Sequence, residues 1–170
     1  MVEVSADAEL DHRAVQTYVD WLYTQKLDFG EDFTRDGDEY HLQLLKAWTV
    51  SSVFQDEEFK NATVAECIQV MEEDDFVFDS ECVEYAYREQ GIAAMQDFVL
   101  DVWLVHNNPE KVFEVFDELP FEFHMELVAV ALRRNGREEA GLSGLLEKYT
   151  GGMYEMVDDE IGGSFEMVDA

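Results

Sequence analysis

Carboxylates are the side chains in this sequence with the greatest capacity for chemistry, because Asp and Glu number 40 among its 170 residues. Paired carboxylates can transfer protons as general acid and base, or bind divalent cations. The runs at 57–58, 72–75 and 158–160 lack the alternating oxygen ligands and central glycine of a calcium-binding loop. Residues 32–38 come closest to such a loop, but Arg35 interrupts them. Carboxylates this abundant do not mark a site, and we predict no metal ion.

The histidines, cysteines and serines do not form a catalytic pattern either. The four histidines are scattered, with no second His or Cys at the spacing of metal ligands. Ser51, Ser52 and Ser80 have no nearby histidine in the sequence to activate them. Glycine-rich phosphate loops, His-Glu-x-x-His pairs and Cys-x-x-Cys pairs are also missing from the sequence. The sequence therefore predicts a protein that is not an enzyme and that uses no cofactor.

The charge is the most unusual feature of the composition. Only 11 Lys and Arg residues oppose the acids, which leaves a formal net charge of −29 at pH 7. Such a field repels phosphate backbones and anionic membranes, so we expect neither nucleic acid nor membrane as a partner, while basic proteins would be attracted. Three interpretations stay open: a solvated acidic surface, adaptation to high salt, and an acidic binding protein or nucleic-acid mimic that engages basic partners.

The cysteines and the N-terminal segment bear on the cellular compartment. Cys67 and Cys82 lie in apolar helical patterns, where buried free thiols in a reducing compartment are expected, although a disulfide stays possible. The first residues lack the basic and apolar regions of a secretory signal, and no apolar run reaches membrane-spanning length. We expect an intracellular protein, cytoplasmic or nuclear.

The elements expected to carry the residues described above are helices. Apolar residues make up 47% and aromatic residues 13% of the chain, and only two prolines occur. The pattern predicts a mostly α fold: a compact multi-helix domain of about seven or eight helices, with at most a short β element and a flexible acidic C-terminal tail. The predicted organisation is an N-terminal arm over 1–10, a helical domain over 11–149 and the acidic tail over 150–170.

Hydrophobic periodicity gives the helix positions. The predicted helices are 11–24, 39–54, 58–71, a short one from Ser80, 92–105, one that begins near Pro109, and 121–134. Residues 92–105 have the strongest amphipathic pattern, so we expect the central helix there. In the first helix, Val15, Tyr18, Val19 and Leu22 form the predicted inner face, and 27–29 alternate like a short strand.

Arg133, Arg134 and Arg137 form the only basic cluster in the sequence. Cations near a helix C-terminus interact favourably with the helix dipole, which accounts for the cluster structurally. A docking site for an acidic partner is the alternative interpretation.

The C-terminal tail contains a short repeat. The pattern Gly-Gly-x-aromatic-Glu-Met-Val-Asp occurs at 151–158 and again at 162–169. The two copies could form a bivalent tail that anchors in grooves of a partner, a flexible duplicated tail, or a strand pair that folds back on the body. The candidate anchoring residues are Tyr154, Met156, Phe165 and Met167.

Several segments resemble BTB/POZ-domain proteins, the fungal type in particular. Residues 19–27, Val-Asp-Trp-Leu-Tyr-Thr-Gln-Lys-Leu, are similar to a helix-to-strand segment of that domain, with Gln25 in place of the usual glycine. Further similarity lies at 41–48, 54–61, 98–103 and 119–123, so the resemblance covers roughly 15–134. It implies that 11–75 correspond to the second half of the domain and 76–149 to a helical extension. The upstream strands and helices of a complete domain are not in this sequence.

The resemblance implies a protein–protein interaction module, an adaptor fragment related to ubiquitin-ligase substrate receptors. Its partner would be another protein, with a basic protein as one option and self-association as another. The aromatic residues expected to be partly exposed on the contact surface are Tyr23, Phe29, Phe33 and Tyr40. The competing interpretation places all four in the core.

Overall fold

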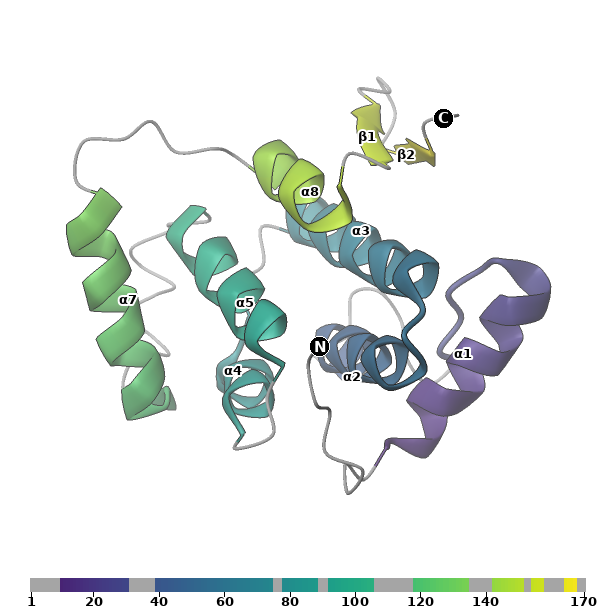
Figure 1. Ribbon diagram of the computed structural model, residues 1–170, viewed down its shortest axis with the longest axis horizontal. Helices are drawn as coiled ribbons and strands as arrows, with labels where there is room; N and C mark the ends of the chain where they lie inside the picture. Colours follow the sequence, from purple (N-terminus) through teal and green to yellow (C-terminus); the bar gives the residue numbers. More distant parts are fainter. Residues whose placement is uncertain are drawn as a thin grey trace.

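The fold is known from a computed structural model, which describes residues 10–30, 39–74, 78–88, 92–105, 118–134, 142–151, 154–157 and 164–167. These residues form seven helices and one pair of antiparallel strands (Figure 1). The helices are α1 (His12–Thr24), α2 (Glu39–Phe54), α3 (Glu57–Asp74), α4 (Ser80–Tyr87), α5 (Ala93–Val105), α7 (Phe121–Arg134) and α8 (Leu142–Thr150). The strands are β1 (Tyr154–Val157) and β2 (Ser164–Met167).

The mostly helical fold predicted from the sequence is confirmed. The bounds of α2 and α7 are those that the periodicity gave, and the remaining predicted helices within the described residues differ only at their ends. Two of the predictions concern residues outside the described ranges: the helix expected to begin near Pro109, and the partial exposure of Phe33.

The β structure lies elsewhere than expected. The predicted strand at 27–29 is wrong: these residues form no strand, and Phe29 packs its ring edge-on against Tyr40 instead. The strands belong to the repeat in the tail, where the register places Tyr154 opposite Met167 and Met156 opposite Phe165. Each aromatic position of one copy therefore pairs with the methionine position of the other. Of the three alternatives given for the tail, the structure contains the strand pair.

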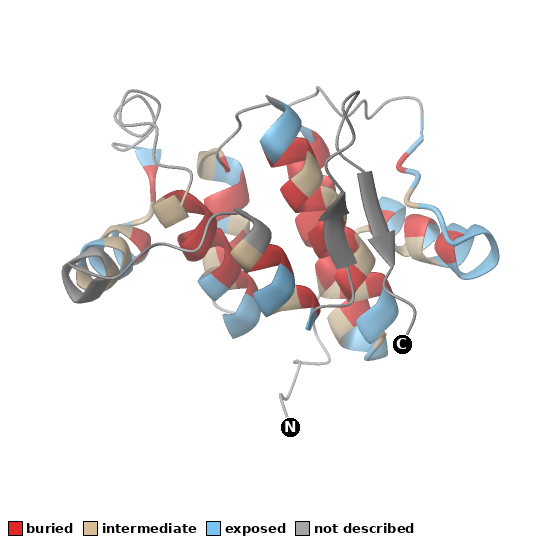
Figure 2. Ribbon diagram, turned by 90° about the horizontal axis from the view of Figure 1, so that it is seen from above, coloured by how far each residue is buried: buried red, intermediate tan, exposed pale blue. Residues whose placement is uncertain are grey.

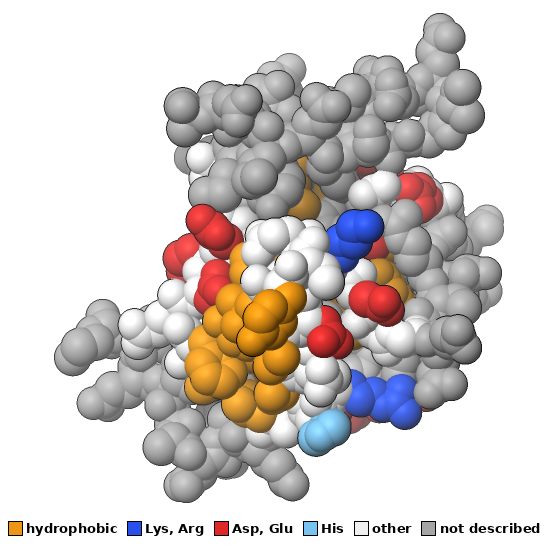
Figure 3. Space-filling model, turned by 90° about the vertical axis from the view of Figure 1, so that its right-hand side faces the viewer, with side chains coloured by type: hydrophobic (Ala, Val, Ile, Leu, Met, Phe, Trp, Pro, Cys, Tyr) orange, Lys and Arg blue, Asp and Glu red, His pale blue; other side chains and the backbone are white. Residues whose placement is uncertain are grey.

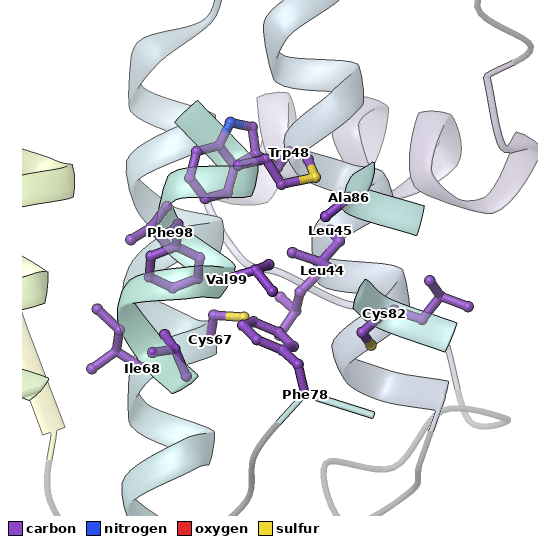
Figure 4. Packing of buried hydrophobic residues seen from close by; sticks show 14 of the residues in the cluster. Leu44, Leu45, Trp48, Cys67, Ile68, Phe78, Cys82, Ala86, Phe98 and Val99 are labelled. Carbon is purple, nitrogen blue, oxygen red and sulfur yellow. The ribbon is translucent and has the colours of Figure 1, made fainter. Parts of the chain in front are cut away.

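The centre of the molecule is α2. Ten of its 16 residues are buried, on every side of the helix, and it packs against α1, α3 and α4 (Figure 2). Trp48 of α2 also contacts Phe98 of α5, with ring centroids 5.4 Å apart (Figure 4). The expected central helix, α5, is also deeply buried and packs against α4, α7 and α8. Two helices thus share the central position that was predicted for α5 alone.

Aspartates hold the starts of the helices. Asp11 accepts hydrogen bonds from the backbone N–H groups of Arg13 and Ala14, at 2.9 and 3.1 Å, and lies 3.3 Å from the Lys46 ammonium of α2. Burial alone would raise the pKa of Asp11, but the Ala14 bond and Lys46 outweigh it and lower the pKa. Asp79 caps α4 in the same way through the Cys82 N–H.

Tyrosine hydroxyls connect helices to one another. Four of them donate to carboxylates that lie on or at the start of another helix: Tyr18 to Asp56 (3.1 Å), Tyr40 to Glu66 (2.8 Å), Tyr87 to Glu126 (2.7 Å) and Tyr149 to Asp101 (2.8 Å). A fifth hydroxyl, that of Tyr85 on α4, lies 2.9 Å from Thr49 Oγ1 on α2. In a chain with so few cations, a neutral donor thus satisfies carboxylates where helices meet.

Asp101 makes the most buried of these contacts. Its Oδ2 accepts from the Lys148 ammonium at 2.6 Å and from the Tyr149 hydroxyl at 2.8 Å, and its side chain is only 8% exposed. Lys148 also lies over the Tyr149 ring, 4.8 Å from its centroid. Asp101 therefore joins α5 to α8.

Both cysteines are free and fully enclosed by the core (Figure 4). Burial raises the pKa of the Cys67 and Cys82 thiols well above 9.0, and neighbouring carboxylates add to the shift. The thiols stay protonated, so they act as small apolar side chains.

We predict that Asp101→Ala lowers the free energy of unfolding by about 1–3 kcal/mol, because Lys148 and Tyr149 lose their shared acceptor. Chemical denaturation measures the change. Asp97→Ala, at an exposed acid of the same helix, is the control and should change stability by less than about 0.5 kcal/mol. Equal effects of the two substitutions would contradict the structural role of Asp101.

Tyr87 should contribute to alkaline unfolding. Burial raises its pKa above the usual 10.0, and the bond to Glu126 raises it further. The folded state keeps a proton that the unfolded state loses, so this stabilisation is complete below pH 10.0 and is lost as the pH rises toward the folded value. The melting temperature of Tyr87→Phe should therefore fall less steeply above that pH. Tyr23→Phe, at an 85% exposed ring, should keep the wild-type slope.

Candidate protein-binding surface

A group of exposed apolar side chains lies on α1 and at the end of α2. We call it the α1–α2 apolar surface; its members and exposed fractions are Val19 (40%), Leu22 (49%), Tyr23 (85%), Val53 (36%) and Phe54 (52%). Figure 3, which faces the α1 side of the molecule, shows hydrophobic side chains gathered in one area with acidic side chains at its edge. Apolar surface gathered in this way is a common mark of a binding site.

The inner face of α1 differs from the predicted one. Ala14, Thr17 and Trp21 are its buried residues, and Trp21 packs on Phe59 of α3 with ring centroids 5.2 Å apart. The Thr17 hydroxyl donates to the backbone oxygen of Asp28, 3.0 Å away. Val19 and Leu22, which the periodicity placed inside, are exposed. Val15 and Tyr18 of the predicted face are partly buried against the core. Tryptophan and two small residues let α1 lie close to its neighbours, so the buried face is rotated away from Val19 and Leu22.

Tyr18 fixes the geometry between α1 and α2. Its ring stacks on Phe54, with centroids 5.0 Å apart and planes 13° from parallel, and meets Phe59 at 4.9 Å. Its hydroxyl donates to Asp56 Oδ2 at 3.1 Å. Burial and the Asp56 carboxylate together raise the pKa of Tyr18. Phe54 is therefore held in position although half of it faces solvent.

A two-residue elbow follows Phe54, as the sequence predicted. Gln55 has a left-handed backbone, with φ 56°, which ends α2. Asp56 then accepts from the Phe59 N–H at 2.9 Å and starts α3. The exposed end of α2 is thereby held by a short, hydrogen-bonded connection.

The end of α1 uses the same conformation. Gln25 has φ 56°, and its backbone N–H donates to the Trp21 oxygen at 2.8 Å. Left-handed backbone at this position favours glycine. Gln25 makes such a turn with a side chain in place, at a cost in stability.

The aromatic residues predicted to lie on the contact surface differ in their exposure. Tyr23 is exposed, but Phe29 and Tyr40 are buried, and the expectation that these two are partly exposed is wrong. Their rings pack edge to face at 5.4 Å, and the Tyr40 hydroxyl reaches Glu66. Because the Tyr40 hydroxyl is hydrogen-bonded to a carboxylate of the protein, the side chain can be buried without losing a hydrogen bond. For the candidate tail residues Tyr154, Met156, Phe165 and Met167, the structure describes how they pair across the two strands.

A second exposed apolar group lies on α7, and sequence reasoning did not single it out. Phe121, Met125 and Val128 are 70%, 56% and 51% exposed. Their spacing of four and then three residues was the available signal. Phe123, on the other side of α7, is fully buried against Tyr87 and Trp103.

A polar cleft of about 330 Å³ runs along α1 beside residues 28–30. It is lined by His12, Arg13, Gln16, Thr17, Asp20, Asp28, Phe29 and Gly30. Among the described residues, no three His, Cys, Asp or Glu side chains converge well enough to hold a metal ion.

No protein-family model, curated protein or solved structure matches this chain. Within the described part of the chain, every helix is too short or too polar to cross a membrane.

We predict that Gln25→Gly raises the free energy of unfolding by about 0.5–1 kcal/mol, because glycine adopts the left-handed conformation without steric cost. Gln16→Gly, in the exposed middle of the same helix, should instead lower it by about 1 kcal/mol. Thermal or urea unfolding of the two variants distinguishes a conformational effect from a general effect of glycine. Destabilisation by both would show that the turn at Gln25 is not left-handed.

Proposed function

We propose that this protein is a protein–protein interaction module, an adaptor fragment related to fungal BTB/POZ proteins, and that its α1–α2 apolar surface binds the partner. The observation that carries the proposal is that surface itself: five apolar side chains exposed together on one face of a chain with net charge −29. Single exposed apolar residues are ordinary on protein surfaces, whereas a contiguous group favours association.

The surface is held in place before any partner binds. Tyr18 stacks on Phe54 and bonds to Asp56, while the buried Trp21 holds α1 against α3. Side chains already fixed lose little conformational entropy on binding, which favours affinity. Tyr23 and Leu22, the most exposed members on α1, are the expected anchors.

The surrounding charge specifies the chemistry of the partner. Asp20 on α1 is an exposed acid on a helix that carries the apolar surface, and Glu57 and Glu58 are exposed acids at the start of α3, directly after the end of α2. We infer that the partner presents apolar anchors flanked by lysine or arginine, which the acids attract and orient. The acidic mimic is the second candidate, favoured by the excess of 40 acids over 11 bases; it would bind by charge alone.

Two further observations support the adaptor proposal. The order α1, α2, α3 with a two-residue elbow between α2 and α3 fits the resemblance of 19–61 to the second half of a BTB/POZ domain, and Gln25 keeps a backbone that suits glycine. The buried free thiols Cys67 and Cys82 suit a reducing, intracellular compartment.

The test is affinity capture from a lysate of the source cell, at physiological and at high salt, followed by titration of the captured partner. Leu22→Glu should weaken partner binding by about thirtyfold, the loss of about 2 kcal/mol typical of a central anchor. Met125→Glu, at an equally exposed apolar residue of α7, is the matched control and should bind as the wild type does.

Salt separates the two candidates. Binding through the apolar surface should survive high salt and be lost in Leu22→Glu. Capture of many basic proteins that salt abolishes, with equal binding by both variants, would contradict the adaptor proposal and favour the mimic.

A further inference from the structure

The polar cleft beside α1 and the α1–α2 apolar surface share the exposed side of that helix. Residues three apart on a helix are neighbours on its surface. Gln16 of the cleft therefore lies next to Val19 of the apolar surface, and Asp20 of the cleft lies next to Tyr23. A partner that covers Val19 and Tyr23 thus reaches the edge of the cleft.

Hydrogen bonds place two aspartates in this cleft. The Thr17 hydroxyl donates to the backbone oxygen of Asp28 at 3.0 Å, which holds the segment after α1 against the helix. Asp20 and Asp28 thus line the cleft from two different segments. Oδ1 of Asp28 accepts from the Gly30 N–H at 2.8 Å, and Oδ1 of Asp20 accepts from Gln16 Nε2 at 3.1 Å. Oδ2 of each carboxylate is left to accept from a further donor.

The charge at this end of the cleft is negative. In the described part of the chain, no lysine, arginine or histidine forms an ion pair with Asp20 or Asp28. The cations that line the cleft, His12 and Arg13, belong to the start of α1. Asp20 follows Arg13 by seven residues, about 10 Å along the helix axis. A cation can therefore bind beside the two aspartates without meeting the basic end.

The size and walls of the cleft suit one side chain. Its volume of about 330 Å³ is at the lower end of the range for ligand pockets, and its walls combine the two carboxylates with the ring of Phe29. A guanidinium group is planar, donates through a fork of N–H groups and is more weakly hydrated than an ammonium, so it suits carboxylates beside an aromatic ring better than lysine does. We propose that the cleft binds an arginine side chain of the partner that contacts the α1–α2 apolar surface.

The arginine defines how the partner lies on α1. It has to be close to the partner residue that contacts Tyr23, because Asp20 and Tyr23 are neighbours on the helix. The apolar contacts contribute most of the affinity, and the arginine fixes the position of the partner along α1. The inference rests on the proposed function for the source of the arginine, but binding of a guanidinium group to the cleft can be measured without the partner.

The experiment is an NMR titration of the isotope-labelled full chain with N-acetyl-arginine amide, whose only charge is the guanidinium group. The probe should shift the backbone amide signals of Asp20 and Gly30 saturably, with a Kd in the millimolar range. N-acetyl-citrulline amide has nearly the same shape without the charge and should not bind. N-acetyl-lysine amide has the charge without the fork of donors and should bind several-fold more weakly.

Two substitutions remove the charge and keep the hydrogen bonds of the fold. Asp20→Asn and Asp28→Asn retain an Oδ1 that accepts from Gln16 and Gly30, respectively. Each should weaken binding of the arginine probe about tenfold, because the guanidinium loses a charged acceptor. Glu58→Gln, at an exposed acid outside the cleft, loses the same charge and is the matched control. It should bind the probe as the wild type does.

Three results would overturn the arginine site: shifts that do not saturate, a lysine probe that binds as well as the arginine probe, and equal weakening by Glu58→Gln. Each would indicate unspecific attraction to a chain of net charge −29. Binding of the citrulline probe would overturn it as well, because the charge would then be irrelevant.

The outcome can be told apart from that of the proposed function. If Leu22→Glu weakens partner binding but the arginine probe does not bind, the inference on the cleft fails alone. If the probe binds as expected but Leu22→Glu leaves partner binding unchanged, the proposed function fails and the guanidinium site stands.

Discussion

The burial of α2 on all sides is the constraint on which the rest of the structure depends. Ten of its 16 residues are withdrawn from water, and they point in every direction around the helix. A helix of this kind is stable only when other helices enclose it, so α1, α3 and α4 must pack around it and α5 must reach Trp48. The two surfaces discussed above lie on helices at the margin of this arrangement, α1 and α7.

The charge of the chain decides how the enclosing helices are joined. Carboxylates outnumber cations by 40 to 11, so lysine and arginine are too few to pair with most of the acids in the sequence. Tyrosine provides an uncharged donor on an apolar ring, which packs in the core and still satisfies a carboxylate, as at Tyr40–Glu66 and Tyr87–Glu126. A tyrosine hydroxyl adds no positive charge, so the chain stays strongly acidic. Exposed acids such as Asp20 on α1 and Glu122 on α7 lie on the same helices as the apolar groups, which favours partners with basic side chains.

The helices could be predicted from the sequence because their signals are local. Asp11, Asp56 and Asp79 start helices through their own backbone neighbours, and the apolar period gives α2 and α7 their lengths. Which face of α1 is buried could not be predicted, because two sides of this helix are apolar. The buried face is the one on which Ala14 and Trp21 pack closely against the neighbouring helices. The burial of Phe29 and Tyr40 depends on Glu66, a residue distant in the sequence. The spacing of Phe121, Met125 and Val128 on α7 is apparent in the sequence. Only the structure shows that the opposite side of that helix is packed against the core through Phe123.

Native-state hydrogen exchange tests the central role of α2 most directly. If α2 is enclosed by the other helices, its backbone amides can exchange only when the whole domain opens, so their protection should equal the global free energy of unfolding. The amides of α7 and α8, which lie further from the centre, should exchange earlier through local opening. Exchange of the α2 amides that is faster than, or equal to, that of α7 would show that the fold does not depend on enclosing this helix.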